Sequence, residues 1–136
     1  MRIGVLTGGG DCPGLNAVIR AVTKSLLRQC GAEVIGIRNG FAGLMGAAPQ
    51  TRPLDWDNVS GILMQGGTML GTSNRADPLR NEASAAQALA HARALGLDAL
   101  VAIGGDGTMA IAHGLSLRGL PRSWNSYHWS YRARCS

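Results

Sequence analysis

Two glycine-rich segments, each following a short apolar run, constrain the fold more than any other feature of this sequence. The first, Thr7–Gly14, follows the run Arg2–Leu6, and the second, Gly104–Thr108, follows the run Asp98–Ile103. Each apolar run has the length of a buried strand, and each glycine segment leads into a helical pattern. Open α/β sheets bind ligands where their strands end and their helices begin. We therefore expect both glycine segments to lie together at one edge of the sheet.

The spacing of apolar residues predicts the remaining elements. Helices are expected over residues 15–28, 57–64, 81–96 and 108–117, and a further strand over Glu33–Ile37. Gly31 suits the position past the first helix, Asp55 or Asp57 the start of the second, and Asn81 the N-cap of the third. Residues 39–53 and 65–78 are rich in glycine and proline, so both are expected to be mostly loop. Strands that alternate with helices predict a three-layer α/β sandwich with a mostly parallel sheet.

Composition excludes several classes of protein. The 136 residues suggest one domain, and the net charge of +5 divides unevenly: residues 1–121 hold ten Lys and Arg against eight Asp and Glu. No long basic run occurs there, so nucleic acid is an unlikely partner. No apolar stretch has the length of a membrane span, and the N-terminal run is too short for a signal peptide. The three cysteines lack metal-ligand spacing, so we expect free thiols in the cytoplasm.

The last fifteen residues differ in composition from all that precede them. Residues 122–136 contain three arginines, two of the three tryptophans and both tyrosines, but no glycine. They show neither helical nor strand periodicity. The sequence therefore divides into a body, residues 1–121, and an unrelated basic and aromatic tail, residues 122–136. The tail is either a nucleic-acid arm or a segment without a selected role.

The first glycine segment has the chemistry of a phosphate-binding turn. Glycine lets the backbone approach a phosphate, and N–H groups at a helix start attract anionic oxygen. Gly8, Gly9 and Gly10 could therefore surround phosphate groups, although a tight turn alone would also explain them. The spacing is not a dinucleotide fingerprint, and the only lysine, Lys24, excludes a P-loop. Asp11 either contacts an acceptor hydroxyl or caps the helix.

The second glycine segment adds a carboxylate. A bare carboxylate beside phosphate would repel it, unless a divalent cation lies between the two, and Mg²⁺ is held in this way. Asp106 is therefore the metal candidate, acting through water, and Gly105, Gly107 and Thr108 would offer backbone and hydroxyl donors. The alternative is that Asp106 serves only as a helix N-cap.

The remaining reactive side chains give weaker signals. Arg75, in a glycine-rich loop, could bind phosphate or stack on a base, or could be solvated. Cys12 has no evident base beside it, so no nucleophile is assigned. His91 and His113 are expected at the surface or at its boundary with the core, and Trp56 in packing.

Three segments together resemble the 6-phosphofructokinase family. They are Thr7–Arg20, Gly66–Arg75 and Gly104–Thr108, which occur in the family's order and spacing within residues 1–121. The resemblance implies an incomplete version of the family's fold and transfer of the ATP γ-phosphoryl group, with Mg²⁺, to fructose 6-phosphate. It implies ATP contacts and a Mg²⁺ contact at these positions: Gly10, Arg75, Ala76, Gly105, Asp106, Gly107 and Thr108 for ATP, and Asp106 for the metal.

The resemblance has further implications. Gly107 implies ATP as donor, because pyrophosphate-using relatives tend to place Asp there. Arg20 and Lys24 fall where bacterial relatives, which are homotetramers, bind an allosteric nucleotide.

The family's catalytic-base segment and sugar-binding half have no counterpart in residues 122–136. No catalytic residue is therefore assigned, and we expect a natural truncation or a shifted reading frame and a chain inactive alone. Two other functions stay open: a non-enzymatic nucleotide-binding module, and an NAD or lipid kinase, which would share a similar Gly-Gly-Asp-Gly-Thr string.

Overall fold

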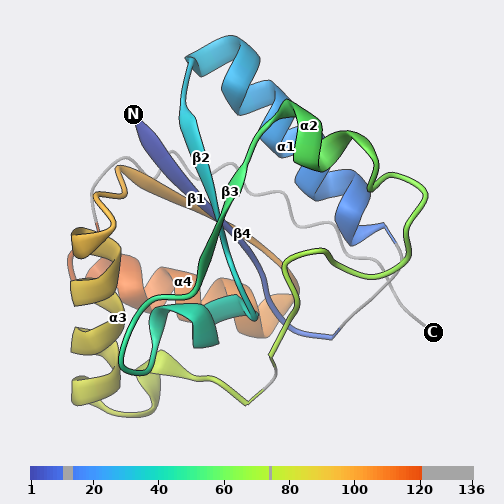
Figure 1. Cartoon of the computed structure of the whole chain (residues 1–136). Helices are drawn as coiled ribbons and strands as arrows, with labels where there is room; N and C mark the ends of the chain where they lie inside the picture. Colours follow the sequence, from blue (N-terminus) through green and yellow to red (C-terminus); the bar gives the residue numbers. More distant parts are fainter. Residues whose placement is uncertain (11–13, 74, 121–136) are drawn as a thin grey trace.

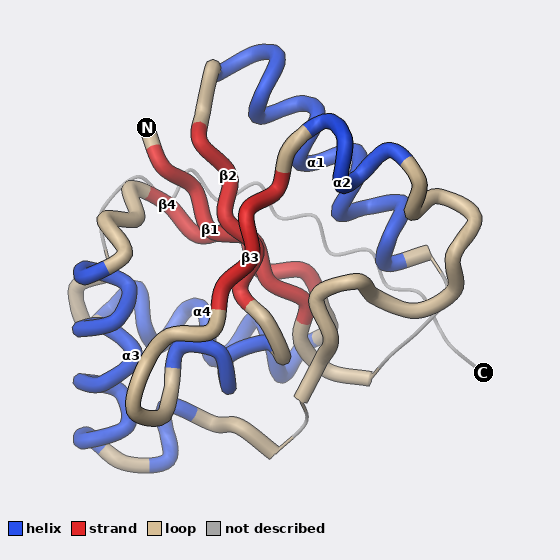
Figure 2. Tube along the Cα trace, in the orientation of Figure 1, coloured by secondary structure: helices blue, strands red, loops and turns tan. Residues whose placement is uncertain are grey.

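The described part of the protein is built around one mixed sheet of four strands. A computed structural model describes residues 1–10, 14–73 and 75–120, so Asp11, Cys12 and the tail lie outside the described residues. The sheet has the order β3-β2-β1-β4 (Figure 2). Its strands are β1 (Arg2–Thr7), β2 (Glu33–Ile37), β3 (Thr51–Leu54) and β4 (Ala99–Ile103). β1 runs parallel to β2 and to β4, whereas β3 is antiparallel to β2.

Helices cover both faces of this sheet and complete three layers. α1 (Leu15–Cys30) and α2 (Trp56–Ser60) lie on one side of the sheet, and α3 (Glu82–Ala94) and α4 (Asp106–Leu117) on the other (Figure 1). Among the described residues, two 3₁₀ turns complete the fold: η1 (Gly40–Leu44) lies between β2 and β3, and η2 (Pro78–Arg80) lies before α3. The predicted three-layer α/β architecture with a mostly parallel sheet is confirmed.

A separate apolar core lies on each face of the sheet. Successive side chains of a strand point to opposite faces, so Val5 enters the α1–α2 core and Leu6 the α3–α4 core. Both side chains are fully buried. Burial of one such side chain contributes about 1.5–3 kcal/mol, and the two cores together fix β1 at the centre of the molecule.

The residues predicted to cap the helices are confirmed at Gly31, Asp55 and Asn81. Gly31 follows α1 with a left-handed φ of 58°, a conformation that glycine adopts without strain. Asn81 caps α3, because its side-chain oxygen accepts a hydrogen bond from the Ser84 N–H at 2.8 Å. Asp55 and Asn58 form a reciprocal capping box at the start of α2.

One strand and several helix boundaries differ from the prediction. β3 lies within residues 39–53, which were expected to be mostly loop, and Pro53 lowers the strand signal there. Pro53 is tolerated because β3 is a terminal strand of the described sheet and needs fewer backbone donors. α2 ends at Ser60, short of the predicted 64, and α4 begins at Asp106, two residues before Thr108.

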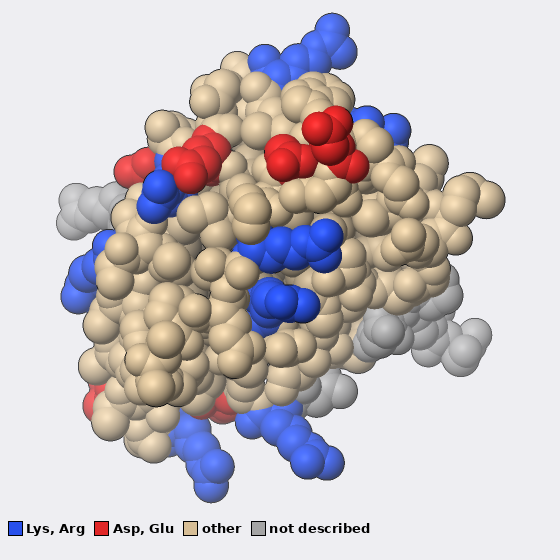
Figure 3. All heavy atoms as spheres, viewed as in Figure 1, with Lys and Arg blue, Asp and Glu red and all other residues tan. Residues whose placement is uncertain are grey.

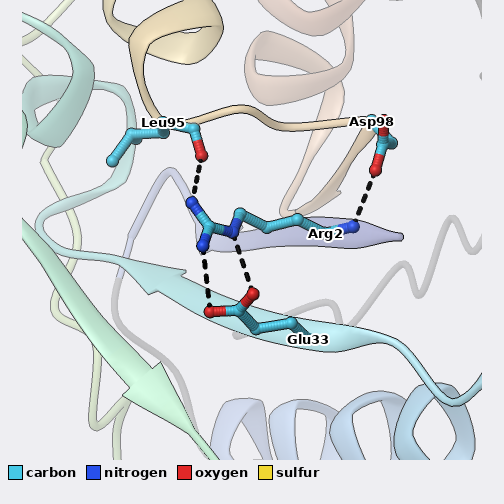
Figure 4. A network of polar contacts seen from close by, with 4 residues as sticks. All are labelled: Arg2, Glu33, Leu95 and Asp98. Carbon is cyan, nitrogen blue, oxygen red and sulfur yellow. Dashed lines mark hydrogen bonds and ion pairs between the residues drawn. The ribbon is translucent and has the colours of Figure 1, made fainter.

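Arg2 joins three segments at the amino ends of the parallel strands (Figure 4). Its guanidinium donates to both carboxylate oxygens of Glu33, at 3.1 and 3.2 Å, and to the Leu95 carbonyl at 2.7 Å. Its backbone N–H donates to the Asp98 carboxylate at 2.7 Å. β1 is thereby linked to β2 and to the turn before β4.

We expect the carbonyl contact of Arg2 to contribute more stability than its ion pair. Arg2→Ala should lower the free energy of unfolding by about 1 kcal/mol, the typical net value of one hydrogen bond. Glu33→Ala should lower it by less than about 0.5 kcal/mol, because exposed ion pairs contribute little. Urea denaturation followed by circular dichroism measures both, and equal losses would contradict this ranking.

Candidate functional site

The two glycine segments lie side by side, as the sequence predicts. β1 and β4 are neighbours in the sheet, with Thr7 opposite Ile103. The Gly8 N–H donates to the Ile103 carbonyl at 2.8 Å. A Cβ atom added to Gly104 would lie 2.8 Å from the Gly8 carbonyl oxygen. The backbones of the two segments are therefore in direct contact at the carboxyl edge of the sheet.

Thr108 packs between the two segments. A Cβ atom on Gly8 or on Gly104 would lie 2.5 Å from the Thr108 Oγ1. The Thr108 side chain is buried, with 5% of its surface exposed. Gly8 and Gly104 are therefore required by internal packing, and the Thr108 side chain holds the two segments together.

Gly105 and Gly107 have no such structural reason to be glycine. In residues 1–10, 14–73 and 75–120, a Cβ built at either position has no atom within 4 Å apart from the adjacent residues and the glycine's own helix backbone, and the same holds for Gly10. Gly105 has a φ of −90°, and Gly107 lies within α4, so neither needs a left-handed backbone. All three positions are exposed. The missing side chains leave bare backbone open to a ligand.

The start of α4 shows whether Asp106 is the N-cap of that helix. Gly105 is the N-cap and no side chain among the described residues caps the helix, so the alternative reading of Asp106 as an N-cap is wrong. Asp106 and Gly107 instead occupy the first turn, where N–H groups lack helical partners and favour anions. The Asp106 side chain is exposed beside these groups.

A metal at Asp106 would need ligands beyond the protein groups described. Within the described ranges, no three His, Cys, Asp or Glu side chains gather into a metal site. This pattern fits Mg²⁺, which commonly takes one or two carboxylates and completes its shell with phosphate oxygens and water.

A third segment, Thr68–Ser73, lies against the first glycine segment. The buried Thr7 hydroxyl contacts the Thr68 hydroxyl and the Gly71 carbonyl, both at 2.9 Å. A Cβ on Gly40, at the start of η1, would lie 2.9 Å from the Thr7 carbonyl oxygen and 3.6 Å from both the Gly8 Cα and the Ser73 nitrogen. Four segments therefore converge on the end of β1.

Arg75 and Ala76 follow this third segment. Arg75 is exposed, and its backbone N–H donates to the Ser73 hydroxyl at 3.4 Å. Ala76 is half-buried. The position of Arg75 therefore depends on how the preceding loop is anchored.

The predicted allosteric residues lie elsewhere, on α1. The Lys24 ammonium is 5.0 Å from the centre of the Trp56 ring, a cation–π geometry. Trp56, expected in packing, is 46% exposed. The Nε of Arg20 is buried and has no hydrogen-bond partner within the described part of the chain.

Sequence reasoning missed several residues that shape this region. Thr7 and Gly40 act through contacts between distant segments, and no local pattern distinguishes them. His91 and His113 agree with their expected place at the surface or its boundary: His91 is half-buried with its Nδ1 2.8 Å from the Leu44 carbonyl, and His113 is exposed. An open polar groove of about 620 Å³ adjoins the third segment and is lined by Arg38, Asn39, Pro49, Gln50, Thr51 and Thr68–Gly71.

The charges on the face that carries β3 are mixed in sign. Figure 3 shows acidic side chains near α2 and basic side chains in the middle of the same face. None of the helices in the described ranges combines the length and the apolar character needed to cross a bilayer.

Comparisons with known proteins agree with this geometry. The family described as phosphofructokinase matches residues 2–124. ATP-dependent 6-phosphofructokinase 3 of Streptomyces coelicolor is 52% identical over 122 residues, which cover 89% of this chain and 35% of that protein. Pyrophosphate–fructose 6-phosphate 1-phosphotransferase of Amycolatopsis methanolica is 44% identical over 128 residues, 90% of this chain and 37% of that one.

Solved structures give the same result. The crystal structure of Pichia pastoris phosphofructokinase in the T-state superposes with a TM-score of 0.76 at 37% identity, covering 84% of this chain and 12% of that one. The chain thus spans about a third of the length of the curated relatives, 35% and 37% for the two above. Because the family matches nearly all of the described residues, the chain belongs to the phosphofructokinase family.

Proposed function

We propose that residues 1–120 supply the nucleotide side of phosphoryl transfer, binding Mg·ATP over the two glycine segments. The observation that carries this proposal is the open space above Gly10, Gly105 and Gly107, where neither packing nor, at Gly105 and Gly107, backbone conformation requires glycine. Exposed backbone that is kept free of side chains, beside a helix start, is what a phosphate chain needs.

Each group in the site has a role in this proposal. The first-turn N–H groups of α4 donate to phosphate oxygens, helped by the positive end of the helix dipole. Asp106 holds Mg²⁺, in part through water, and the cation neutralises phosphate charge as it develops during transfer. Arg75 adds a second cation from the third segment, and Ala76 leaves room beside it.

The acceptor is proposed from the relatives. Both curated proteins compared above are named for phosphorylation of a fructose phosphate. We propose fructose 6-phosphate as acceptor, and with it a glycolytic, cytoplasmic role. No described residue is assigned to deprotonate the sugar hydroxyl. Allosteric nucleotide binding at Arg20 and Lys24, and a tetramer, stay predictions.

The donor is proposed from Gly107. Relatives named for ATP and for pyrophosphate match comparably well: an ATP-dependent S. coelicolor protein is 51% identical, and a pyrophosphate-dependent Dictyoglomus thermophilum protein 49%. A carboxylate at position 107 would extend into open space beside the phosphates and repel them. Glycine keeps this space free for the longer donor. Pyrophosphate is the second candidate, and calorimetry with each Mg²⁺ complex decides: tighter binding of pyrophosphate would contradict the ATP assignment.

Gly107→Ala should change stability and nucleotide affinity in opposite directions. Alanine is favoured over glycine within a helix by up to about 1 kcal/mol, so the free energy of unfolding should rise. The added methyl group occupies proposed phosphate space, so Mg·ATP affinity should fall about tenfold, or about 1.4 kcal/mol. Urea denaturation and calorimetry measure the two, and unchanged affinity in the stabilised variant would argue against a phosphate site here.

Gly8→Ala should instead destabilise the protein. Its Cβ would lie 2.5 Å from the Thr108 Oγ1, and overpacking of this kind typically costs about 1–3 kcal/mol. Removing the Thr108 hydroxyl should relieve the clash, so the double variant Gly8→Ala/Thr108→Ala should be at least about 0.5 kcal/mol more stable than the sum of the single effects. Additive losses in urea denaturation would mean that Thr108 does not pack between the segments.

A further inference from the structure

Asn16 has an amide side chain that no step of the proposed phosphoryl transfer uses. It is the second residue of α1, and 2% of its surface is exposed. A polar side chain at this depth is costly unless its donor and acceptor are both satisfied. The contacts of Asn16 therefore indicate why an amide is needed at this position.

The Asn16 amide binds two backbone groups of the segment before Arg75. Its Oδ1 accepts a hydrogen bond from the Met69 N–H at 2.6 Å. Its Nδ2 donates to the Gln65 carbonyl at 3.3 Å. Gln65 and Met69 flank the three residues Gly66–Thr68, so one side chain closes this part of the loop against α1.

Two further residues, Thr7 and Asn39, bind the later part of this loop. The Leu70 carbonyl accepts from the Asn39 N–H at 2.8 Å, and the Gly71 carbonyl accepts from Thr7. Asn16 binds the start of the loop, at the Gln65 carbonyl. Thr7 and Asn39 bind it from Thr68 onward. Glycine-rich backbone loses much entropy when it is ordered, so the start of the loop needs a fixed partner.

We propose that Asn16 is a positioning residue for the nucleotide loop, fixing the path of residues 65–71 and thereby the placement of Arg75. The effect on nucleotide binding rests on the proposed function. The pair of hydrogen bonds from Asn16 to Gln65 and Met69, which we call the clamp, is present in the free protein. Asn16 is too deeply buried to meet the ligand, so it acts through the loop.

Two substitutions test the two hydrogen bonds of the amide. Asn16→Asp keeps an acceptor for the Met69 N–H but loses the donor to Gln65 and places negative charge against that carbonyl. Asn16→Leu removes both bonds and leaves the Met69 N–H without its partner. Asn81→Ala is the matched control, because it removes one side-chain hydrogen bond to a helix N–H at 2.8 Å on a different element.

The experiment measures hydrogen exchange of the Met69 amide and Mg·ATP affinity in the full chain. In the unsubstituted protein, the Met69 amide should exchange at least about a hundredfold more slowly than in a peptide of the same sequence, since it is bonded and half-buried. Asn16→Leu should speed exchange of residues 65–71 and weaken Mg·ATP binding, each about tenfold, the equivalent of one lost hydrogen bond to a buried group. Asn16→Asp should give exchange rates and a Mg·ATP affinity between those of the unsubstituted protein and of Asn16→Leu. Asn81→Ala should change neither the exchange of residues 65–71 nor the affinity.

The outcomes distinguish the two proposals. Fast exchange of Met69 in the unsubstituted protein overturns the clamp without any variant, even where Asn16→Leu does not fold. Equal exchange of residues 65–71 in Asn16→Leu and Asn81→Ala also overturns it. If the unsubstituted chain binds Mg·ATP and Asn16→Asp binds it equally well, the positioning role is wrong. Absence of Mg·ATP binding by the unsubstituted chain contradicts the proposed function instead, and the exchange data still decide the clamp.

Discussion

The contact of Thr108 with Gly8 and Gly104 is the constraint on which the rest of the site depends. It requires β1 and β4 to be neighbours, because the two glycines belong to the ends of these strands. It also requires both residues to lack a side chain, since a Cβ at either would lie 2.5 Å from the threonine oxygen. A threonine from the first turns of α4 thereby sets the distance between two stretches of bare backbone.

The glycines of the site therefore divide into two groups with different physical roles. Gly8 and Gly104 are glycine because the protein packs against them, whereas Gly105 and Gly107 are glycine without any contact to avoid within the described residues. The first group lets the two segments pack closely, and the second leaves their backbone exposed. The sequence alone cannot separate the two groups, because packed and open glycines are adjacent in it.

Much of the fold follows from local sequence, because local signals fix it. The apolar runs that became β1, β2 and β4 and the caps at Gly31 and Asn81 are set by side chains within a few residues. β3 was missed because Pro53 weakens the strand pattern, and only its place at the end of the described sheet makes it acceptable. Asp106 could not be separated from an N-cap by sequence, because α4 begins two residues before the expected Thr108. Helix boundaries are not fixed to a single residue by sequence.

The contacts between distant segments were outside the reach of sequence reasoning. Asn16 lies 53 residues from Met69, and Thr7 lies 64 residues from Gly71. The sequence around Asn16 or Thr7 contains no signal for such a distant partner. In this glycine-rich region, long-range hydrogen bonds order a loop that has little side-chain packing of its own.

The central claim is that both glycine segments bind one phosphate chain at once. Titration of ¹⁵N-labelled protein with Mg·ATP, followed by backbone amide chemical shifts, tests it most directly. The account predicts that the amides of Gly9 and Gly10 and those of Gly105 to Gly107 shift together, with a single dissociation constant. Shifts confined to one segment, or centred on α1 and Trp56 while both segments stay unchanged, would contradict it.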